Sequence, residues 1–320
     1  MKKVAVLFLL FAFCFTSACN RGQEQSKTSG PRVALVLKTL NNPFFIDMQK
    51  GAEEAAQRLG INLIVQAAER EVDVEKQMQI IENLIQAQVN ALCITPSGSK
   101  EIIPSIAKAN QANIPVLILD TRVDENAARE AGIELATFIG SDNYQGGLIA
   151  GRHLVEQFAG KAKVAILEGI PGHETGDARM RGFHDAIKEA PGIEVIASQT
   201  ANWERDQGFN VFQNLLQAHH DLDALFACND MMALGAIEAI AAAGKTGRIK
   251  VVGFDAVDDA RTAIQAGAML ASVAQFPADM GRLAIENAVK VIQGETLPAY
   301  IPTKIELIEK EDAQRITAAN

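Results

Sequence analysis

The sequence predicts an α/β fold made of two doubly wound parallel-sheet lobes. Short apolar runs alternate with amphipathic stretches from residue 32 onward, which is the pattern of successive βαβ units. The runs of the first half recur in the second half after an offset of 131 to 135 residues. A length of 320 residues also suffices for about two domains. Two similar lobes would bring two sets of strand ends together, which is where open parallel sheets bind ligands.

Four strands and three helices are expected in the first half, because β-branched runs there are separated by helical periodicity. The strands are expected at residues 33–37, 62–66, 91–94 and 116–119. The helices are expected at residues 44–59, 74–88 and 102–111. Gly60 directly follows the first helix, as a glycine in the left-handed stop position would.

The second half repeats this scheme. Its strands are expected at residues 163–167, 194–198, 224–227, 251–254 and 270–274. Its helices are expected at residues 144–158, 177–188, 206–217, 230–243 and 258–266, followed by a last helix at 277–292. Asp230 and Asp258 stand where a carboxylate can cap free backbone N–H groups, and Pro277 occupies the first turn that tolerates proline.

The two lobes are expected to share a hinge of three short crossings. These crossings are placed at residues 138–141, 275–277 and 300–303, and none allows a long linker. The predicted N-terminal lobe comprises residues 32–140 and 276–300, and the predicted C-terminal lobe comprises 141–275 and 301–320. Several short crossings favour hinge closure over a loose tether.

The amino terminus has the features of an export signal. Lys2 and Lys3 precede an apolar run at residues 4–15, too short to span a membrane as a helix of about 20 residues. Small residues before Cys19 resemble the bacterial lipobox, in which that cysteine is lipidated; the alternative is ordinary cleavage with Cys19 incidental. We therefore predict a signal peptide at 1–18, a lipidated Cys19 with a flexible tether at 19–31, and a membrane-anchored protein facing the periplasm or, in a one-membrane bacterium, the outer surface.

The net charge argues against a nucleic-acid partner. Removal of residues 1–18 leaves 28 basic against 39 acidic residues, a net charge of −11. Two cysteines of the mature chain, Cys93 and Cys228, lie in corresponding strands of the two repeats. Strands in different lobes hold them too far apart for a disulfide, so both are expected to be small buried apolar residues.

Aromatic and ionisable residues follow several predicted strands. Asn42, Phe44 and Phe45 come after the first strand, and Asp120 ends the fourth. The C–H faces of a sugar stack on aromatic rings, while its buried hydroxyls need charged or polar partners. Further candidates at strand ends or the following turns are Arg179, Asn229, Asp255 and Gln275. Each polar residue alone could instead be a helix cap, and Phe44 could be a core residue, but the set together indicates a sugar site.

Four segments carry a resemblance to a known family: Thr39-Leu-Asn-Asn-Pro-Phe-Phe45, Asn110-Gln-Ala-Asn-Ile-Pro-Val116, Asn229-Asp230 with Met232-Ala-Leu-Gly-Ala236, and Val251-Val-Gly-Phe-Asp255. With these, the chain resembles the ribose-type periplasmic sugar-binding proteins of ABC importers over residues 32–308. The resemblance implies the type I periplasmic binding protein fold, a monosaccharide ligand and a partner permease in the membrane. It also implies a pocket formed by Asn42, Phe44, Phe45, Asp120, Arg179, Trp203, Asn229, Phe254, Asp255 and Gln275.

Two positions depart from the ribose pattern and could set specificity. Thr121 stands where ribose binders carry an arginine, with Arg122 one place later, and Trp203 stands where they usually carry phenylalanine. Loss of a five-donor guanidinium changes which sugar oxygens find partners, and an indole enlarges the stacking surface. Ribose and a hexose such as allose, psicose or fructose therefore both remain open.

Signals of other chemistry are weak. Gly244-Lys-Thr246 ends a helix instead of opening one and lacks the first glycine of a P-loop. His219-His220, and His173 with Glu174, have no metal-site spacing and are expected to be solvated loop histidines. No cofactor, no metal and no catalytic residue are expected, and the chain is expected to act as a monomer.

Three functions other than import make different demands on the sequence. A sensory module for a membrane receptor or histidine kinase would use the same pocket. An exported carbohydrate-active enzyme would need Asp120 and Asp255 as acid and base. A sugar-responsive repressor would need an amino-terminal helix-turn-helix where the signal segment stands.

Overall fold

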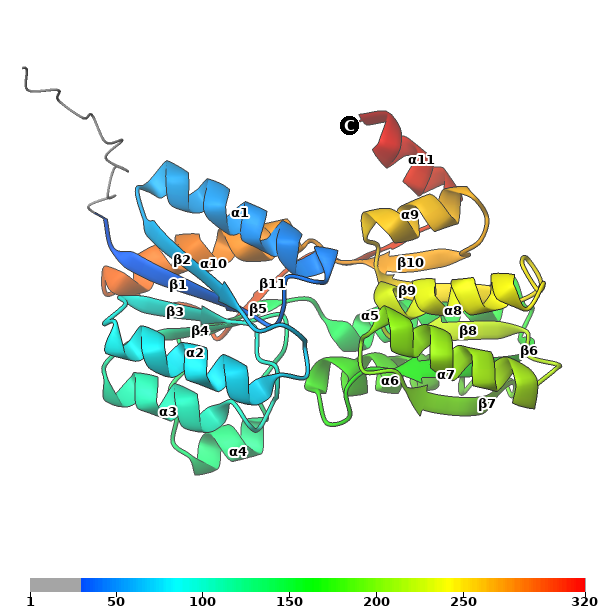
Figure 1. The fold of residues 1–320 in the computed structure, drawn as a ribbon, viewed down its shortest axis with the longest axis horizontal. Coiled ribbons are helices and arrows are strands. Elements are labelled where there is room, and N and C mark those ends of the chain that lie inside the picture. Colours follow the sequence, from blue (N-terminus) through cyan, green and yellow to red (C-terminus); the bar gives the residue numbers. More distant parts are fainter. Residues whose placement is uncertain (1–29, 320) are drawn as a thin grey trace, which may run out of the picture.

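The computed structural model describes residues 30–319. The predicted signal peptide, Cys19 and nearly all of the predicted tether lie outside this range. Within it, the chain forms two six-stranded sheets, each covered by helices, and the two halves lie side by side along the long axis (Figure 1).

The first sheet has the strand order β11-β5-β4-β3-β1-β2, with every neighbouring pair parallel. Its strands are β1 (Arg32–Leu37), β2 (Asn62–Ala67), β3 (Ala91–Ile94), β4 (Val116–Leu119), β5 (Thr137–Gly140) and β11 (Tyr300–Pro302). The second sheet has the order β12-β10-β9-β8-β6-β7. Its strands are β6 (Lys161–Glu168), β7 (Gly192–Thr200), β8 (Ala224–Ala227), β9 (Lys250–Asp255), β10 (Ala271–Ala274) and β12 (Glu306–Ile308).

The two sheets have the same strand order once each strand is matched to its repeat, which confirms the predicted internal repeat. One difference is at the edge, where β12 pairs antiparallel with β10 while β11 is parallel to β5. The chain passes between the sheets three times: after β5, after β10 and between β11 and β12.

Helices cover both faces of the first sheet. They are α1 (Pro43–Leu59), α2 (Val74–Gln86), α3 (Ile103–Gln111), α4 (Glu125–Glu130) and α10 (Pro277–Ile292). Alternate residues of β1 serve the two faces, because side chains of a strand alternate in direction. Val33 and Leu35 pack in the same apolar cluster as residues of α1 and α10, whereas Ala34 and Val36 pack with residues of α2 and α3. Figure 1 shows these two pairs of helices on opposite faces of the sheet.

The helices around the second sheet are α5 (Asn143–Gln157), α6 (Glu174–Ile187), α7 (Arg205–Ala218), α8 (Asp230–Ala242), α9 (Asp258–Gln265) and α11 (Lys310–Ala319). Glycines let paired helices approach closely. A Cβ on Gly147 of α5 would lie 2.0 Å from the Arg179 carbonyl oxygen of α6, and one on Gly182 of α6 would lie 2.0 Å from the Tyr144 carbonyl oxygen of α5. This close contact fixes α6, which carries two of the cleft residues described below. Among residues 30–319, no helix is long and apolar enough to cross a membrane.

The predicted elements agree with the structure apart from shifts at some of their ends and a few elements that are short or at an edge. The helix expected at 177–188 begins earlier, at Glu174. β12, α4 and α11 were not predicted. Most residues of the crossings expected at 138–141 and 300–303 belong instead to strands β5 and β11, which pair with each other. The chain changes sheets directly after each of these strands.

Candidate ligand-binding site

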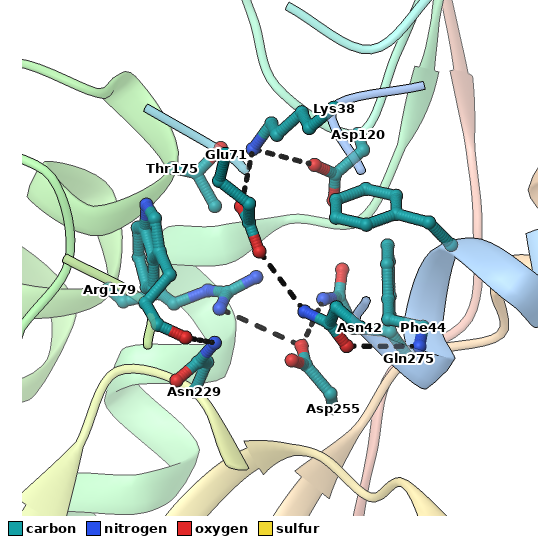
Figure 2. Close-up of a pocket in the computed structure, with 12 residues that line it drawn as sticks. Lys38, Asn42, Phe44, Glu71, Asp120, Thr175, Arg179, Asn229, Asp255 and Gln275 are labelled. Carbon is teal, nitrogen blue, oxygen red and sulfur yellow. Dashed lines mark hydrogen bonds and ion pairs between the residues drawn. The ribbon is translucent and has the colours of Figure 1, made fainter. Parts of the chain in front are cut away.

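The carboxyl ends of strands from both sheets face each other across a cleft. From the first half, the cleft is lined by Lys38, Asn42, Phe44, Phe45, Glu71 and Asp120. From the second half, it is lined by Thr175, Arg179, Trp203, Asn229, Asp255 and Gln275 (Figure 2). The space between these side chains, counted together with the solvent at its mouth, is about 270 Å³.

Nine of the ten residues predicted for the pocket line this one cleft. The tenth, Phe254, has a fully buried side chain behind Arg179, whose guanidinium carbon lies 3.7 Å from the ring centroid. Lys38, Glu71 and Thr175 were not predicted. Lysine is mostly exposed in proteins, so a lysine directly after a buried strand is unusual. That position was the signal in the sequence that could have indicated Lys38.

On the side of the first sheet, a lysine lies between two carboxylates. Lys38 Nζ is 3.5 Å from Asp120 Oδ2 and 3.6 Å from Glu71 Oε2, and all three side chains are buried. Asn42 Nδ2 donates to Glu71 Oε1 over 3.1 Å, while Asn42 Oδ1 accepts from the Phe44 N–H and caps α1. The turn at Asn42 thus holds Glu71 in the polar cluster and places the rings of Phe44 and Phe45 beside it. The two ring centroids are 5.2 Å apart and the rings are nearly perpendicular.

On the side of the second sheet, Arg179 is held by several partners. Its Nε donates to Asn143 Oδ1 over 2.9 Å, and its Nη1 donates to the Cys228 carbonyl oxygen over 2.6 Å. Nη1 also lies 3.7 Å from Asp255 Oδ1, which accepts from Gln275 Nε2 over 2.8 Å. A guanidinium fixed in this way presents its remaining donors to the cleft in one orientation.

Two buried polar atoms in the cleft have no partner within the described residues. They are the indole Nε1 of Trp203, a donor, and the amide Oε1 of Gln275, an acceptor. A buried polar group without a partner costs about 1 to 3 kcal/mol. A ligand that both accepts and donates hydrogen bonds, as a hydroxyl group does, would satisfy both atoms.

Burial raises the pKa of two carboxyl groups in the cleft. For Asp255 the loss of hydration raises the pKa well above its usual value, although the charge of Arg179 opposes this. For Glu71 the same loss of hydration raises the pKa, opposed first by Lys38. Each carboxylate has therefore lost hydrogen bonds to water, and hydroxyl donors of a ligand could replace them.

Three cleft residues have left-handed backbone, which non-glycine residues rarely adopt. The φ angles are 60° at Asp120, 68° at Trp203 and 112° at Asp255. Such conformations cost on the order of 1 to 3 kcal/mol and occur mainly where function requires a fixed side-chain direction. Asp120 directly follows β4, Asp255 ends β9 and Trp203 lies between β7 and α7, and all three side chains line the cleft.

The two possible specificity residues lie in different places. Thr121 is fully buried beside Asp120 and donates to its Oδ2 over 2.8 Å. The guanidinium carbon of Arg122 lies 3.9 Å from the ring centroid of Phe138 and 4.7 Å from that of Tyr300, away from the cleft lining. The arginine therefore packs on aromatic rings of β5 and β11, next to two of the crossings between the sheets.

The expectation for His173 was wrong, because its side chain is buried and not solvated. His173 precedes the first residue of α6 and lines a second hollow, formed by the turns after β2, β3 and β6. No group of three or more His, Cys, Asp or Glu residues within residues 30–319 could hold a metal ion. Cys93 and Cys228 are both buried and free, as expected.

Comparison with known proteins identifies the family. A model of the periplasmic binding protein domain matches residues 33–296. The chain belongs to the periplasmic binding protein family. This periplasmic binding protein is therefore not an enzyme, and its family places it outside the cytoplasm.

Several relatives of this periplasmic binding protein have named ligands. It is 38% identical to the ribose import binding protein RbsB of Escherichia coli K12, over 97% of this chain and 99% of the relative. It is 35% identical to the D-allose-binding periplasmic protein of the same organism, over 83% of this chain and 88% of the relative. A crystal structure of a solute-binding protein from Actinobacillus succinogenes 130z with bound D-allose has 40% identity and a TM-score of 0.85, covering 89% of this chain and 99% of that one.

Proposed function

We propose that this protein is the substrate-binding component of an ABC sugar importer and binds one monosaccharide of the ribose and allose class. The observation that carries the proposal is the cleft, where charged groups from both sheets surround aromatic rings and leave one donor and one acceptor unpaired. The ribose and allose named for the relatives fit this chemistry, because each offers hydroxyl groups on both sides of a ring with apolar C–H faces. The further partner is a membrane permease, to which the closed protein delivers the sugar.

Binding would work by closure of two lobes about the three crossings. We assign residues 32–140 and 276–300 to one lobe and 141–275 and 301–320 to the other, as the sequence predicts. A sugar bonded to both Asp120 and Asp255 stabilises the closed arrangement, because only that arrangement places both carboxylates within reach. The ligand thus shifts the equilibrium between the open and closed forms, because it binds the closed form more tightly than the open form.

A hexose of the allose type is favoured over ribose within this class. Thr121, which adjoins Asp120 but does not itself line the cleft, stands where the family's ribose binders have arginine, and the cationic neighbour of Asp120 on this side is the ammonium of Lys38. The relative of known structure that is 40% identical holds D-allose. Titration calorimetry with allose, ribose, psicose and fructose decides the order of affinities.

Trp203 is the single tryptophan of the chain, so its emission reports on the cleft alone. Saturating sugar should shift the emission maximum and change its intensity, because the unpaired Nε1 gains a hydrogen-bond partner and the closing lobes exclude water. The measurement is a fluorescence titration over the sugar panel, with N-acetyltryptophanamide as a control for optical artefacts. Saturable heat of binding with an unchanged emission spectrum would contradict the placement of Trp203 against the ligand.

Lipid anchoring at Cys19 is a further part of the proposal. It rests on the small residues before that cysteine, which resemble a lipobox. Mass spectrometry of the protein from membranes should find acyl chains on Cys19, and Cys19→Ser should move the protein to the soluble fraction. An unmodified amino terminus at residue 19 would contradict anchoring without affecting the sugar-binding proposal.

Affinity should also depend on pH through His173. Burial lowers the pKa of this imidazole to about 3 from 6.5, with a smaller contribution from the charge of Lys38 and an opposing hydrogen bond with Ser97. Charged groups lining the same hollow are Lys100, Glu101, Asp124 and Asp177. An opened cleft exposes the imidazole, so between pH 6.5 and 3 the open form holds a proton that the closed form lacks. Closure, and with it affinity, is therefore weakened as the pH falls.

The raised pKa values of Asp255 and Glu71 act in the opposite direction, so the test compares two proteins. The ratio of wild-type affinity to that of His173→Gln should fall by about 10- to 30-fold between pH 7.5 and 5, since the carboxyl contributions cancel in the ratio. Calorimetry at four pH values measures it. A ratio independent of pH would show that His173 does not change its protonation on closure.

A further inference from the structure

Two buried hydroxyl groups connect the two sides of the cleft to one carboxylate. Thr175 Oγ1 donates to Thr121 Oγ1 over 3.0 Å, and Thr121 Oγ1 donates to Asp120 Oδ2 over 2.8 Å. Thr121 is 0% exposed and Thr175 is 3% exposed. Thr121 follows β4 of the first sheet, whereas Thr175 lies in the first turn of α6 beside the second sheet. The bond between them therefore spans the cleft.

The direction of this hydrogen-bond chain is fixed by the carboxylate. An ionised carboxylate only accepts, so the single hydroxyl proton of Thr121 is committed to Asp120. Thr121 must then accept from Thr175, and no other arrangement satisfies all three groups. Asp120 Oδ2 is also 3.5 Å from Lys38 Nζ, so the hydroxyl and the ammonium together orient the carboxyl group.

Because the two threonines belong to different sides of the cleft, opening of the cleft would separate them and break their bond. The bond between Thr121 and Asp120 lies within one side of the cleft and would remain. Thr121 itself is not among the residues that line the cleft. Its hydroxyl can therefore influence a ligand only through Asp120 and through closure.

We propose that Thr121 and Thr175 are positioning residues, which stabilise the closed form by their mutual hydrogen bond and orient the Asp120 carboxylate towards the sugar. The inference rests on the proposed sugar-binding function and adds a closure contact to it. Valine has nearly the shape of threonine without the hydroxyl, so Thr→Val substitutions remove the hydrogen bonds with little change in packing.

The experiment measures allose and ribose binding to Thr121→Val, Thr175→Val and the double variant, by calorimetry and stopped-flow fluorescence. Each single variant should bind about tenfold more weakly, mainly through faster dissociation, since the closed form is what holds the sugar. The double variant should bind no more weakly than Thr121→Val, because that substitution already removes both the bond to Thr175 and the bond to Asp120. Thr121→Ser should retain wild-type affinity.

Thr95→Val is the matched control. Thr95 is also fully buried, but its Oγ1 donates over 3.2 Å to the Val36 carbonyl oxygen within the first sheet. This variant should lower the melting temperature of the sugar-free protein and leave affinity unchanged. Thr175→Val should do the reverse, since its bond is absent from the open form.

Three outcomes would overturn the inference. If the wild type binds sugar and both single variants bind it with unchanged affinity, the role of the threonine pair is rejected while the proposed function stands. Additive losses in the double variant would show that the two hydroxyls act separately. A wild type that binds no sugar of the panel would overturn the proposed function, and with it any effect of the pair on affinity.

Discussion

Asp255→Asn should bind its sugar at least about 100-fold more weakly than the wild type while unfolding at nearly the same temperature. Asp255 is buried, accepts from Gln275 and lies 3.7 Å from a guanidinium nitrogen of Arg179. Its pKa is raised by loss of hydration, so the folded protein gains little from the charge itself. Removing a buried charged partner from a binding site typically costs about 2 to 5 kcal/mol, and a carboxylate that accepts two sugar hydroxyls would be such a partner.

The asparagine variant keeps the shape of the side chain, and asparagine tolerates the left-handed backbone at this position. Calorimetry gives the affinity, and thermal unfolding followed by circular dichroism gives the stability. Asp258→Asn is the control, because Asp258 lies three residues away in the first turn of α9 with its side chain 91% exposed. A variant that unfolds early while its folded fraction binds normally would mean that Asp255 has a structural role instead.

Asp230→Ala should have the opposite signature, a loss of about 3 kcal/mol in the free energy of unfolding. Asp230 is fully buried at the start of α8; Oδ1 accepts from Ser272 Oγ over 2.7 Å, and Oδ2 accepts from the Val257 N–H over 2.9 Å. Alanine leaves both donors buried without a partner, at about 1 to 3 kcal/mol each.

Urea unfolding of the sugar-free protein measures this loss, with Asp258→Ala as the control for removing an acidic residue from a first helical turn. The exposed control should change stability by less than about 0.5 kcal/mol. Burial raises the pKa of Asp230 to about 7, so the measurement is best made at one fixed pH. A loss below 1 kcal/mol would indicate that water reaches Ser272 and Val257 in the variant. The charges of Asp230 and Asp255 repel each other, yet Asp255 is expected to serve the ligand and Asp230 the fold.

The main elements of the fold could be predicted because their patterns are long and strongly periodic. The helix expected at 277–292 has the same bounds as α10, since Pro277 marks its start. The edge strands β11 and β12 have three residues each, which is too short for alternation to be recognised. α4 has six residues and none of them is buried, so it has no apolar face to detect.

The cleft could be predicted where residues directly follow strands, as Asp120 and Asp255 do, because parallel strand ends share one edge. Glu71 could not, since it lies four residues beyond the end of β2 in a turn whose path the sequence does not specify. Lys38 was overlooked because lysine is rarely buried, and only the two carboxylates beside it make this position favourable. Arg122 has a position in the sequence that suggested the pocket, but the rings of Phe138 and Tyr300 provide a better contact for its guanidinium.

The left-handed backbone at Asp120, Trp203 and Asp255 has a consequence for anyone who retargets this protein as a biosensor. At these three codons an alanine scan or a fully randomised library would record conformational cost together with lost recognition, and so would overstate the chemical role of each side chain. Libraries restricted there to aspartate, asparagine and glycine would separate the two effects. New selectivity is more readily sought at Lys38 and Glu71, which line the cleft and do not have left-handed backbone.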